Sequence, residues 1–178
     1  MTVQPIEGKK VIYLVQATNA AKGTKALLPG FQTEGTWTRE HEALDEQTKS
    51  GRILGYGAKT ETFELTLYSA PGDEGQAAIT NAYDNEGQVK VWRVELTPDA
   101  EGAYPARFGY SIISSVAISD ADSFAELTVT LPVIGKTQAG TLTDIPEEIL
   151  NLALYGFETP GEKTGEAGAD SETTPENK

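Results

Sequence analysis

The segment Lys59–Ser69, KTETFELTLYS, decides the fold of this chain. Phe63, Leu65 and Leu67 alternate with threonine and glutamate, so that one face of the segment is apolar and the other is polar. A period of two residues predicts a β-strand with one buried face. We therefore expect a chain built mainly from strands.

Further strands are predicted on both sides of this segment. Residues 124–134 repeat the alternation, and residues 106–119 carry it over one longer strand, with Phe108 and Tyr110 on the apolar side. Shorter strands are predicted over residues 11–17, 33–38 and 88–96, the last of them buried on both faces. The polar faces of the strands at 59–69 and 124–134 carry Thr62, Glu64, Thr66, Glu126, Thr128 and Thr130.

Helical spacing follows the strand at 59–69. Asp73 and Gln76 form a start that resembles a capping box, and Asn85–Gly87 offers a stop. A second short helix is predicted over residues 146–155. The first of these helices is expected to pack on one sheet face.

The residues after Pro160 contain no aromatic or large aliphatic side chain, so their burial cannot offset the entropy lost on ordering. We expect one domain over residues 1–156 and an acidic, disordered tail over residues 157–178.

Residues 39–57, REHEALDEQTKSGRILGYG, show neither a clean helical period nor a clean strand period. Connections inside compact domains usually run about 4 to 6 residues, so a loop of this length is either functional or disordered. The segment carries charges of both signs around Ile53, Leu54 and Tyr56, and it lacks the proline or serine of a passive spacer. This composition indicates a surface that binds a partner.

The net charge of −13 is distributed unevenly. Residues 1–59 hold eight Lys/Arg and six Asp/Glu, a net of +2, whereas residues 60–158 hold four and sixteen, a net of −12. An acidic surface repels phosphates, which argues against ordinary nucleic-acid binding. The asymmetry suits head-to-tail contact between copies of one molecule. The alternative is that the acidity only keeps a β-rich protein soluble.

The residue inventory argues against catalysis. Without cysteine there is no disulfide and no thiolate chemistry, and with His41 as its single histidine a metal site would need carboxylates almost alone. No secretory signal and no membrane span is predicted, which favours synthesis in a cytoplasm. We expect no enzyme activity, no cofactor, no bound metal and no membrane insertion.

Three short motifs are weak matches to known sites. Gly135-Lys136-Thr137 lacks the earlier glycine of a phosphate loop, and the pair Gly55 and Gly57 lacks the third glycine of a dinucleotide fingerprint. Asp120 and Asp122 lack the glycine and glutamate of a calcium loop, so a polar turn is expected there.

Two tryptophans leave open a carbohydrate-binding module, in which aromatic rings stack on sugars. Trp92 lies in a strand that is expected to be buried, and Trp37 lies beside the long loop. Core or interface packing is favoured for both.

The order of these features resembles a known family. The pattern consists of a strand, a charged loop with DEQTKSGRILG at residues 45–55, an alternating strand, Gly72-Asp73 before a short helix, and QVKVWR at residues 88–93. It continues through Phe108-Gly109-Tyr110, PVIG at residues 132–135 and IPEEI at residues 145–149. Over residues 4–156 the chain is similar to the major tail proteins, or tail tube proteins, of long non-contractile-tailed bacteriophages (siphophages).

This resemblance implies a mainly β fold, a β-sandwich with one flanking α-helix, a long inter-strand loop and extended terminal arms. It also implies a structural virion protein that assembles as hexameric rings stacked into a tail tube, through which DNA is ejected into the host. The loop at 39–57 would then bridge subunits and rings. Its candidate assembly residues are Glu42, Asp45, Glu46, Lys49, Gly51, Arg52, Ile53, Leu54, Gly55 and Tyr56.

Strands from six subunits would join into one inner barrel, whose lumen needs a polar face. The candidates for this face are Thr62, Glu64, Thr66, Glu126, Thr128 and Thr130, with both glutamates expected to face the lumen. Double-stranded DNA would pass without specific binding, because an acidic wall lets it slide. Further implied partners are other copies of the chain, a tape measure protein and tail-end proteins. The alternatives are a tube subunit of a phage-derived bacteriocin or secretion system, or an isolated β-sandwich binding module.

Overall fold

The computed structural model describes residues 5–120, 122–143, 145 and 149 of the chain. One compact unit ends at Thr143, and we describe it by itself. The predicted second helix, the domain end at residue 156 and the tail at 157–178 lie outside the described residues, apart from Ile145 and Ile149.

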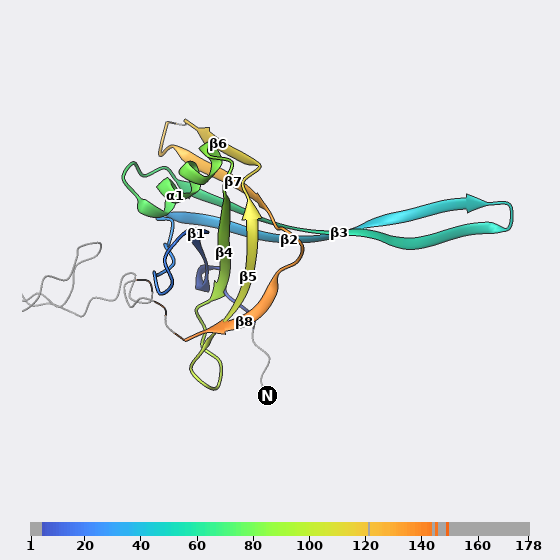
Figure 1. Ribbon diagram of the computed structural model, residues 1–178, viewed down its shortest axis with the longest axis horizontal. Coiled ribbons are helices and arrows are strands. Elements are labelled where there is room, and N and C mark those ends of the chain that lie inside the picture. The colour runs from blue at the N-terminus through green and yellow to red at the C-terminus, as the bar shows by residue number, and fades with distance from the viewer. Residues whose placement is uncertain (1–4, 121, 144, 146–148, 150–178) are drawn as a thin grey trace, which may run out of the picture. The chain divides into compact units, whose positions relative to one another are not determined.

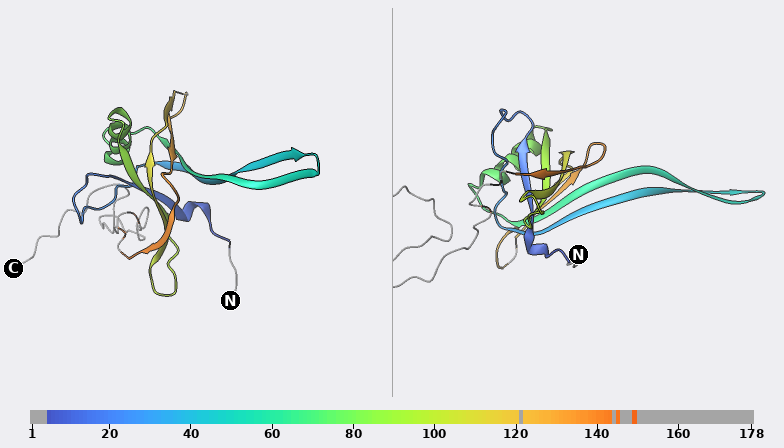
Figure 2. Two further views of the ribbon diagram at one scale, coloured as in Figure 1. Left: turned by 45° about the vertical axis from the view of Figure 1, so that its right-hand side comes forward. Right: turned by 90° about the horizontal axis from the view of Figure 1, so that it is seen from below.

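Two four-stranded antiparallel sheets and one α-helix form this unit (Figures 1 and 2). The predicted mainly β fold with one flanking helix is therefore confirmed. A short 3₁₀ turn, Gly8–Lys10, precedes the first strand. Sheet A has the order β1 (Val11–Ala17), β4 (Gln88–Glu95), β5 (Tyr104–Ile112) and β8 (Gln138–Leu142). Sheet B has the order β2 (Gln32–Thr48), β3 (Gly51–Tyr68), β7 (Glu126–Pro132) and β6 (Ser115–Ser119).

The core lies between the two sheets and follows the predicted alternation. In β3, Phe63, Leu65 and Leu67 are fully buried, and their register partners in β7 are apolar residues of the same buried face. Sheet A and α1 (Glu74–Asp84) close this core. Its remaining members are Tyr13, Val15, Ile79, Val89, Val91, Leu127, Val129 and Leu131.

The helix begins and ends where the sequence predicts. The Asp73 side chain accepts a hydrogen bond from the Gln76 amide at 2.7 Å, which satisfies one free N–H of the first turn. The Gln76 side chain does not return to Asp73, as a full capping box would require. It accepts instead from the Ala70 amide and donates to the carbonyls of Tyr68 and Gly30, so it ties the helix to the end of β3.

The prediction of one strand over residues 106–119 is wrong. The chain breaks after Ile112 and passes from β5 in sheet A to β6 in sheet B. In β5 the buried positions are Gly109 and Ser111, whereas Tyr110 and Ile112 are exposed. A Cβ at Gly109 would lie 3.1 Å from a Val133 methyl group, so a larger residue there would require Val133 to move. The alternation in the sequence is real, but in β5 its apolar side faces outward, whereas in β6 Val116 packs against the core.

The strand β8 was not predicted, because its sequence QAGTL has a single large apolar residue and no alternation. It pairs with β5 from Tyr104↔Leu142 to Phe108↔Gln138 at the edge of sheet A. Tertiary pairing, rather than local preference, makes this segment a strand.

Replacing Gly75 with alanine is predicted to loosen the contact between α1 and the loop before β2. A Cβ at this position would lie 2.6 Å from Pro29 Cα and 2.7 Å from Pro29 N, and backbone atoms cannot rotate away. We expect Gly75→Ala to lower the free energy of unfolding by about 1–3 kcal/mol in urea titrations followed by far-UV circular dichroism. Gly140→Ala, where nothing lies within 4 Å of the added Cβ, is the control. Equal stabilities of the two variants would contradict the prediction.

Candidate assembly surfaces

The strands β2 and β3 continue beyond the rest of sheet B as a two-stranded hairpin (Figures 1 and 2). Pairing of β3 with β7 begins only at Thr62, whereas pairing with β2 reaches Thr48↔Gly51. At 3.3 Å per residue, the part of β2 beyond Thr38 spans about 33 Å. We call residues 39–60 the arm. The prediction of an irregular loop at 39–57 is therefore wrong, since this segment is paired strand on both sides of a tight turn.

A β-bulge in the arm explains why its sequence shows no regular strand period. Between the pairs His41↔Lys59 and Ala43↔Tyr56, β2 advances by two residues and β3 by three. The extra residue exchanges the faces on which odd and even positions of β3 lie. Leu54 and Tyr56 therefore lie on the core-facing side of β3, although they are even-numbered and the buried residues of the strand are odd-numbered.

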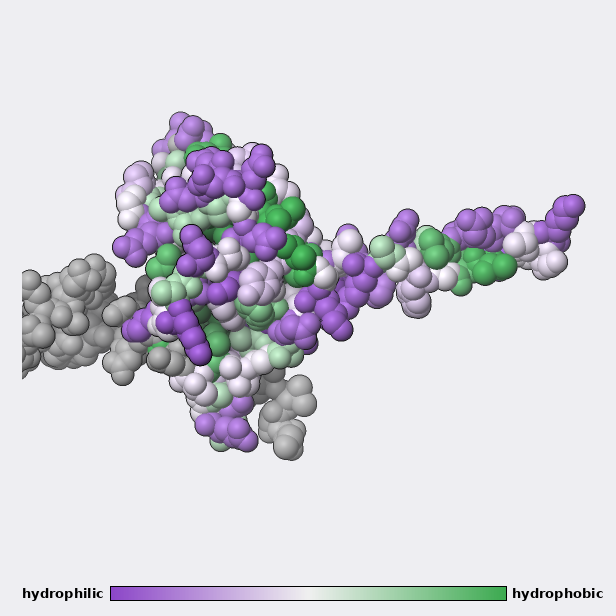
Figure 3. Space-filling model, in the orientation of Figure 1, coloured by the Kyte–Doolittle hydropathy of each residue, from purple (hydrophilic) through white to green (hydrophobic). Residues whose placement is uncertain are grey.

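Both faces of the arm expose apolar side chains. Tyr56 and Leu54 lie on one face and are 84% and 64% exposed, while Ile53 and Leu44 lie on the other. Figure 3 shows hydrophobic (green) surface in the outer half of the arm, between hydrophilic surface at its base and tip. A lone two-stranded hairpin is marginally stable in water, and exposed apolar surface of this kind marks contact sites.

The charged residues of the arm differ in their partners. Arg52 forms a two-pronged ion pair with Asp45, from Nε at 2.7 Å and from a terminal nitrogen at 2.5 Å. Hydrogen bonding from Arg52 lowers the pKa of Asp45 below its ordinary value. Among the ion pairs of the described residues none includes Lys49, which lies in the turn.

A buried carboxylate, Glu61, anchors the base of the arm. It is 4% exposed, and its Oε2 accepts hydrogen bonds from Thr137 Oγ1 at 2.5 Å, Thr137 N at 3.3 Å and Trp37 Nε1 at 3.2 Å. Its Oε1 lies 3.4 Å from Lys59 Nζ. Thr137 immediately precedes β8, so these bonds join β2 and β3 to a segment of sheet A.

Two arginines lie against the Trp37 ring and extend this anchor. The guanidinium carbon of Arg39, in β2, is 4.3 Å from the ring centroid, and that of Arg107, in β5, is 5.1 Å from it. The contact of Arg107 with Trp37 joins a strand of each sheet, and both cation–π contacts add to the hydrogen bonds on Glu61. The arm therefore leaves the body from a fixed base, not from a flexible joint.

The six polar residues predicted to share a surface do lie on one face of sheet B, because they alternate with the buried residues of β3 and β7. Glu64 pairs in register with Thr130, and Thr66 pairs with Thr128. The outward positions of β2 and β6 continue the face with Glu34, Thr36, Thr38, Ser115, Ala117 and Ser119. In these four strands, outside the arm, no lysine or arginine faces outward on this side.

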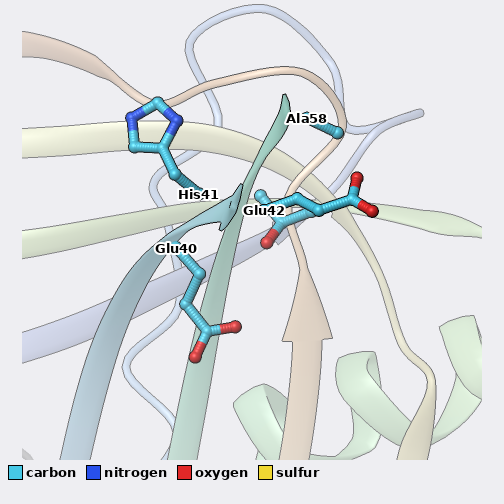
Figure 4. Close-up of a pocket in the computed structure, with 5 residues that line it drawn as sticks. Glu40, His41, Glu42 and Ala58 are labelled. Atoms are coloured by element: carbon cyan, nitrogen blue, oxygen red, sulfur yellow. The ribbon is translucent and has the colours of Figure 1, made fainter. Parts of the chain in front are cut away.

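The base of the arm has a shallow, open hollow, lined by Glu40, His41, Glu42, Ala58 and Thr60. Figure 4 shows the side chains of Glu40, His41 and Glu42 pointing in different directions, so no two of them converge on a common point. The His41 ring packs instead near Tyr56, with 5.2 Å between the ring centroids.

Within the described residues, no group of three or more histidine, aspartate or glutamate side chains is placed to hold a metal ion. No described helix is long and apolar enough to cross a membrane. What distinguishes this unit is its surfaces, namely a rigid arm, an acidic sheet face and open sheet edges. Together they define a subunit of an assembly.

Comparison with known proteins gives the family of this chain. The sequence model of the family described as phage tail tube protein matches residues 5–139. The tail tube protein gp17.1* of Bacillus phage SPP1 is 43% identical over 170 residues, which are 94% of this chain and 64% of that protein. A putative tail protein of Staphylococcus phage phiMR11 is 28% identical over 127 residues, 71% of this chain and 68% of the relative. This chain thus spans less than two thirds of the length of the SPP1 relative.

Solved structures agree with the sequence comparison. A hybrid structure of the SPP1 tail tube, from solid-state NMR and electron cryo-microscopy, matches with a TM-score of 0.76 and 40% identity, over 92% of this chain and 96% of that one. A tail of an empty gene transfer agent particle with C6 symmetry matches in fold alone, with a TM-score of 0.59 at 12% identity, over 75% of this chain and 98% of that one. The chain therefore belongs to the phage tail tube protein family, and the resemblance to major tail proteins is confirmed.

The structure also places residues that the sequence did not single out. No role was predicted for Glu61, because its partner Thr137 is 76 residues away in the sequence. A strand residue that breaks the apolar alternation of a buried face is the signal that could have revealed it.

Replacing Glu61 with glutamine is predicted to reduce the pH dependence of stability. Burial raises the pKa of Glu61, but hydrogen bonds from Thr137, Trp37 and Lys59 lower it by more, so its net pKa is below the ordinary value. A carboxyl whose pKa is lower in the folded state stabilises the protein above its unfolded pKa, and this stabilisation is lost as pH falls through the folded pKa.

Glu61→Gln should therefore be less stable at pH 7 by about 1–3 kcal/mol, and should lose less stability than the wild type between about pH 6 and pH 3. Urea unfolding followed by tryptophan fluorescence measures both quantities. Glu64→Gln, an exposed change on the same strand, is the control. Parallel pH profiles for wild type and Glu61→Gln would contradict this assignment.

Proposed function

We propose that this chain is a structural subunit that polymerises as stacked hexameric rings into the tail tube of a phage virion, a conduit for DNA ejection. The observation that carries this proposal is the 43% identity to the SPP1 tail tube protein over 94% of the chain. The match to the SPP1 tail tube structure includes nearly all of that chain, which supports the same role for the whole unit.

The outward face of sheet B is the surface best suited to line the lumen. A barrel closed from the sheets of six subunits needs apolar residues on one side and polar residues on the other, and sheet B has both. Its edge strands, β2 and β6, have unpaired backbone N–H and C=O groups, and closure of the barrel between subunits would pair them. Glu64 and Glu126 would then give an acidic wall with no opposing cation on the same face.

An acidic wall lets DNA pass because it makes no phosphate contacts. The same lumen would hold a tape measure protein before ejection, and tail-end proteins would close the tube at its ends. The arm would bridge subunits of neighbouring rings, since its apolar residues have no partner surface in the subunit itself and its length exceeds the thickness of the two sheets, about 10 Å apart.

The other readings have less support. Injection-system tubes, among them the sheath-tube complex of an extracellular contractile injection system, match with a TM-score of 0.50 at 10% identity, which shows fold alone. Against a sugar-binding module, Trp37 packs between two arginines and donates to Glu61, while Trp92 stacks on Phe108 at 5.0 Å within sheet A. The rings of Trp37 and Trp92 do not pack together, so they do not form a stacking platform for a sugar.

Reversing the charge of the arm tip is predicted to block polymerisation while the subunit stays folded. In negative-stain electron microscopy, concentrated wild-type protein should form tubes, and Lys49→Glu/Arg52→Glu should remain dispersed because its tip repels acidic neighbours. The Arg52–Asp45 pair is exposed to solvent and contributes little to stability, so folding should survive its loss.

Lys22→Glu/Lys25→Glu makes the same charge change in the exposed connection between β1 and β2 and is the matched control. Normal tubes from the arm variant would refute the role of its charges. A wild-type chain that stays monomeric under all conditions would refute the tube itself.

Replacing two carboxylates of the sheet B face with lysines is predicted to make the lumen hold DNA. Tubes of Glu64→Lys/Glu126→Lys should retain short duplexes that resist nuclease, and retention should fall steeply with salt because it rests on phosphate contacts. Tubes of the wild type should retain none. Glu74→Lys/Glu86→Lys, on and beside α1, is the control for exterior charge. Equal protection by both double variants would argue against a lumenal position of Glu64 and Glu126.

A further inference from the structure

The end of sheet B opposite the arm carries a cluster of exposed aromatic residues. Tyr68 is the last residue of β3, and its ring centroid lies 5.3 Å from that of Phe124, which precedes β7. Phe31 precedes β2, and its carbonyl accepts a hydrogen bond from the Tyr68 amide at 3.0 Å. Phe31 and Phe124 are 68% and 70% exposed. We call these three residues the aromatic end.

The backbone of Phe31 adds to this observation. Its φ is +58°, in the left-handed region that bulky residues rarely adopt. Because the Phe31 side chain is exposed, its packing inside the subunit does not compensate for the strain of its backbone. Strain of this kind concentrates where a residue serves contact with a partner.

The aromatic end and the arm tip lie at the two ends of one strand. β3 runs from Gly51 at the tip to Tyr68 at the aromatic end, about 56 Å at 3.3 Å per residue (Figure 1). The two surfaces therefore cannot meet within one subunit. A head-to-tail contact between copies, which builds an open filament, joins two different surfaces of this kind.

Lys49 of the arm tip is complementary in charge to the aromatic end. No lysine or arginine occurs in residues 60–89 or 108–135, and the turn before β7 carries Asp120 and Asp122. At the arm tip Asp45 and Glu46 balance Lys49 and Arg52, and Arg52 is paired with Asp45, whereas none of the ion pairs of the described residues includes Lys49. Contact would bury apolar area from both sides and bring opposite charges together at the rim.

We propose that the arm face formed by Arg52, Leu54 and Tyr56 docks on the aromatic end of a second copy of this chain in the next ring. Arg52 and Lys49 then lie near the carboxylates of the turn before β7, and Tyr56 and Leu54 cover the rings of Tyr68 and Phe124. This assignment rests on the proposed tube and adds to it the surface that receives the arm.

Disulfide trapping tests the contact directly, because the chain has no cysteine of its own. Tubes of Tyr56→Cys/Phe124→Cys, oxidised and separated on a non-reducing gel, should give a ladder that extends beyond the number of subunits in one ring. Each single variant should stay at monomer or dimer. The control pair Tyr56→Cys/Tyr110→Cys, with an exposed cysteine on β5 of sheet A instead, should give no ladder.

A second measurement uses a substitution at an exposed position, which should leave folding intact. Phe124→Ser should raise the concentration needed for tube formation at least about tenfold, as loss of an aromatic interface anchor does. Its unfolding midpoint should match that of the wild type.

The outcomes separate the two proposals. Wild-type tubes without a Tyr56–Phe124 ladder, or with a ladder that stops at one closed ring, would overturn the docking and leave the tube standing. If Phe124→Ser formed tubes at the same concentration as the wild type, the docking would also be overturned. Wild-type protein that forms no tubes would overturn both.

Discussion

A buried carboxylate has to be hydrogen-bonded, and the way Glu61 meets this requirement sets the geometry of the molecule. Its partners come from β2, from β3 and from the segment before β8, so one side chain joins both sheets at the point where the arm begins. The Trp37 ring, held between Arg39 and Arg107, repeats this connection on an adjacent position. If the carboxylate lost these partners, the arm would leave the body in no defined direction.

One strand, β3, serves three purposes in succession. From Tyr68 back to Thr62 its odd positions fill the core and its even positions form the acidic face, whereas beyond Glu61 both faces are exposed in the arm. The bulge near Gly57 keeps Leu54 and Tyr56 on the core-facing side, with Ile53 and Leu44 on the other side. The core, the acidic face and the arm are therefore coupled, because a shift of register in β3 would move all three.

Where one face of a strand is buried, the sequence alone predicted the structure well: β3, β7 and the start of α1 lie where alternation and capping place them. It failed where that condition does not hold. The arm has no buried face and contains a bulge, so no period survives in its sequence. In β5 the requirement for a small residue at Gly109 inverts the apparent faces. The Glu61 anchor depends on a contact across 76 residues, which no local pattern encodes.

That the arm is a hairpin and not an irregular loop changes the energetics of assembly. A flexible loop of this length would lose about 1–2 kcal/mol of backbone entropy per residue when it ordered against a neighbour. In the hairpin the pairs from Arg39↔Glu61 to Thr48↔Gly51 are already formed, so most of that cost is met during folding of the subunit. The proposed docking would then have to offset mainly the lost translational and rotational freedom of whole subunits, about 4–15 kcal/mol. The charged residues between them, such as Asp45 and Arg52, keep the free arm from pairing edge to edge with other strands before the correct surface is met.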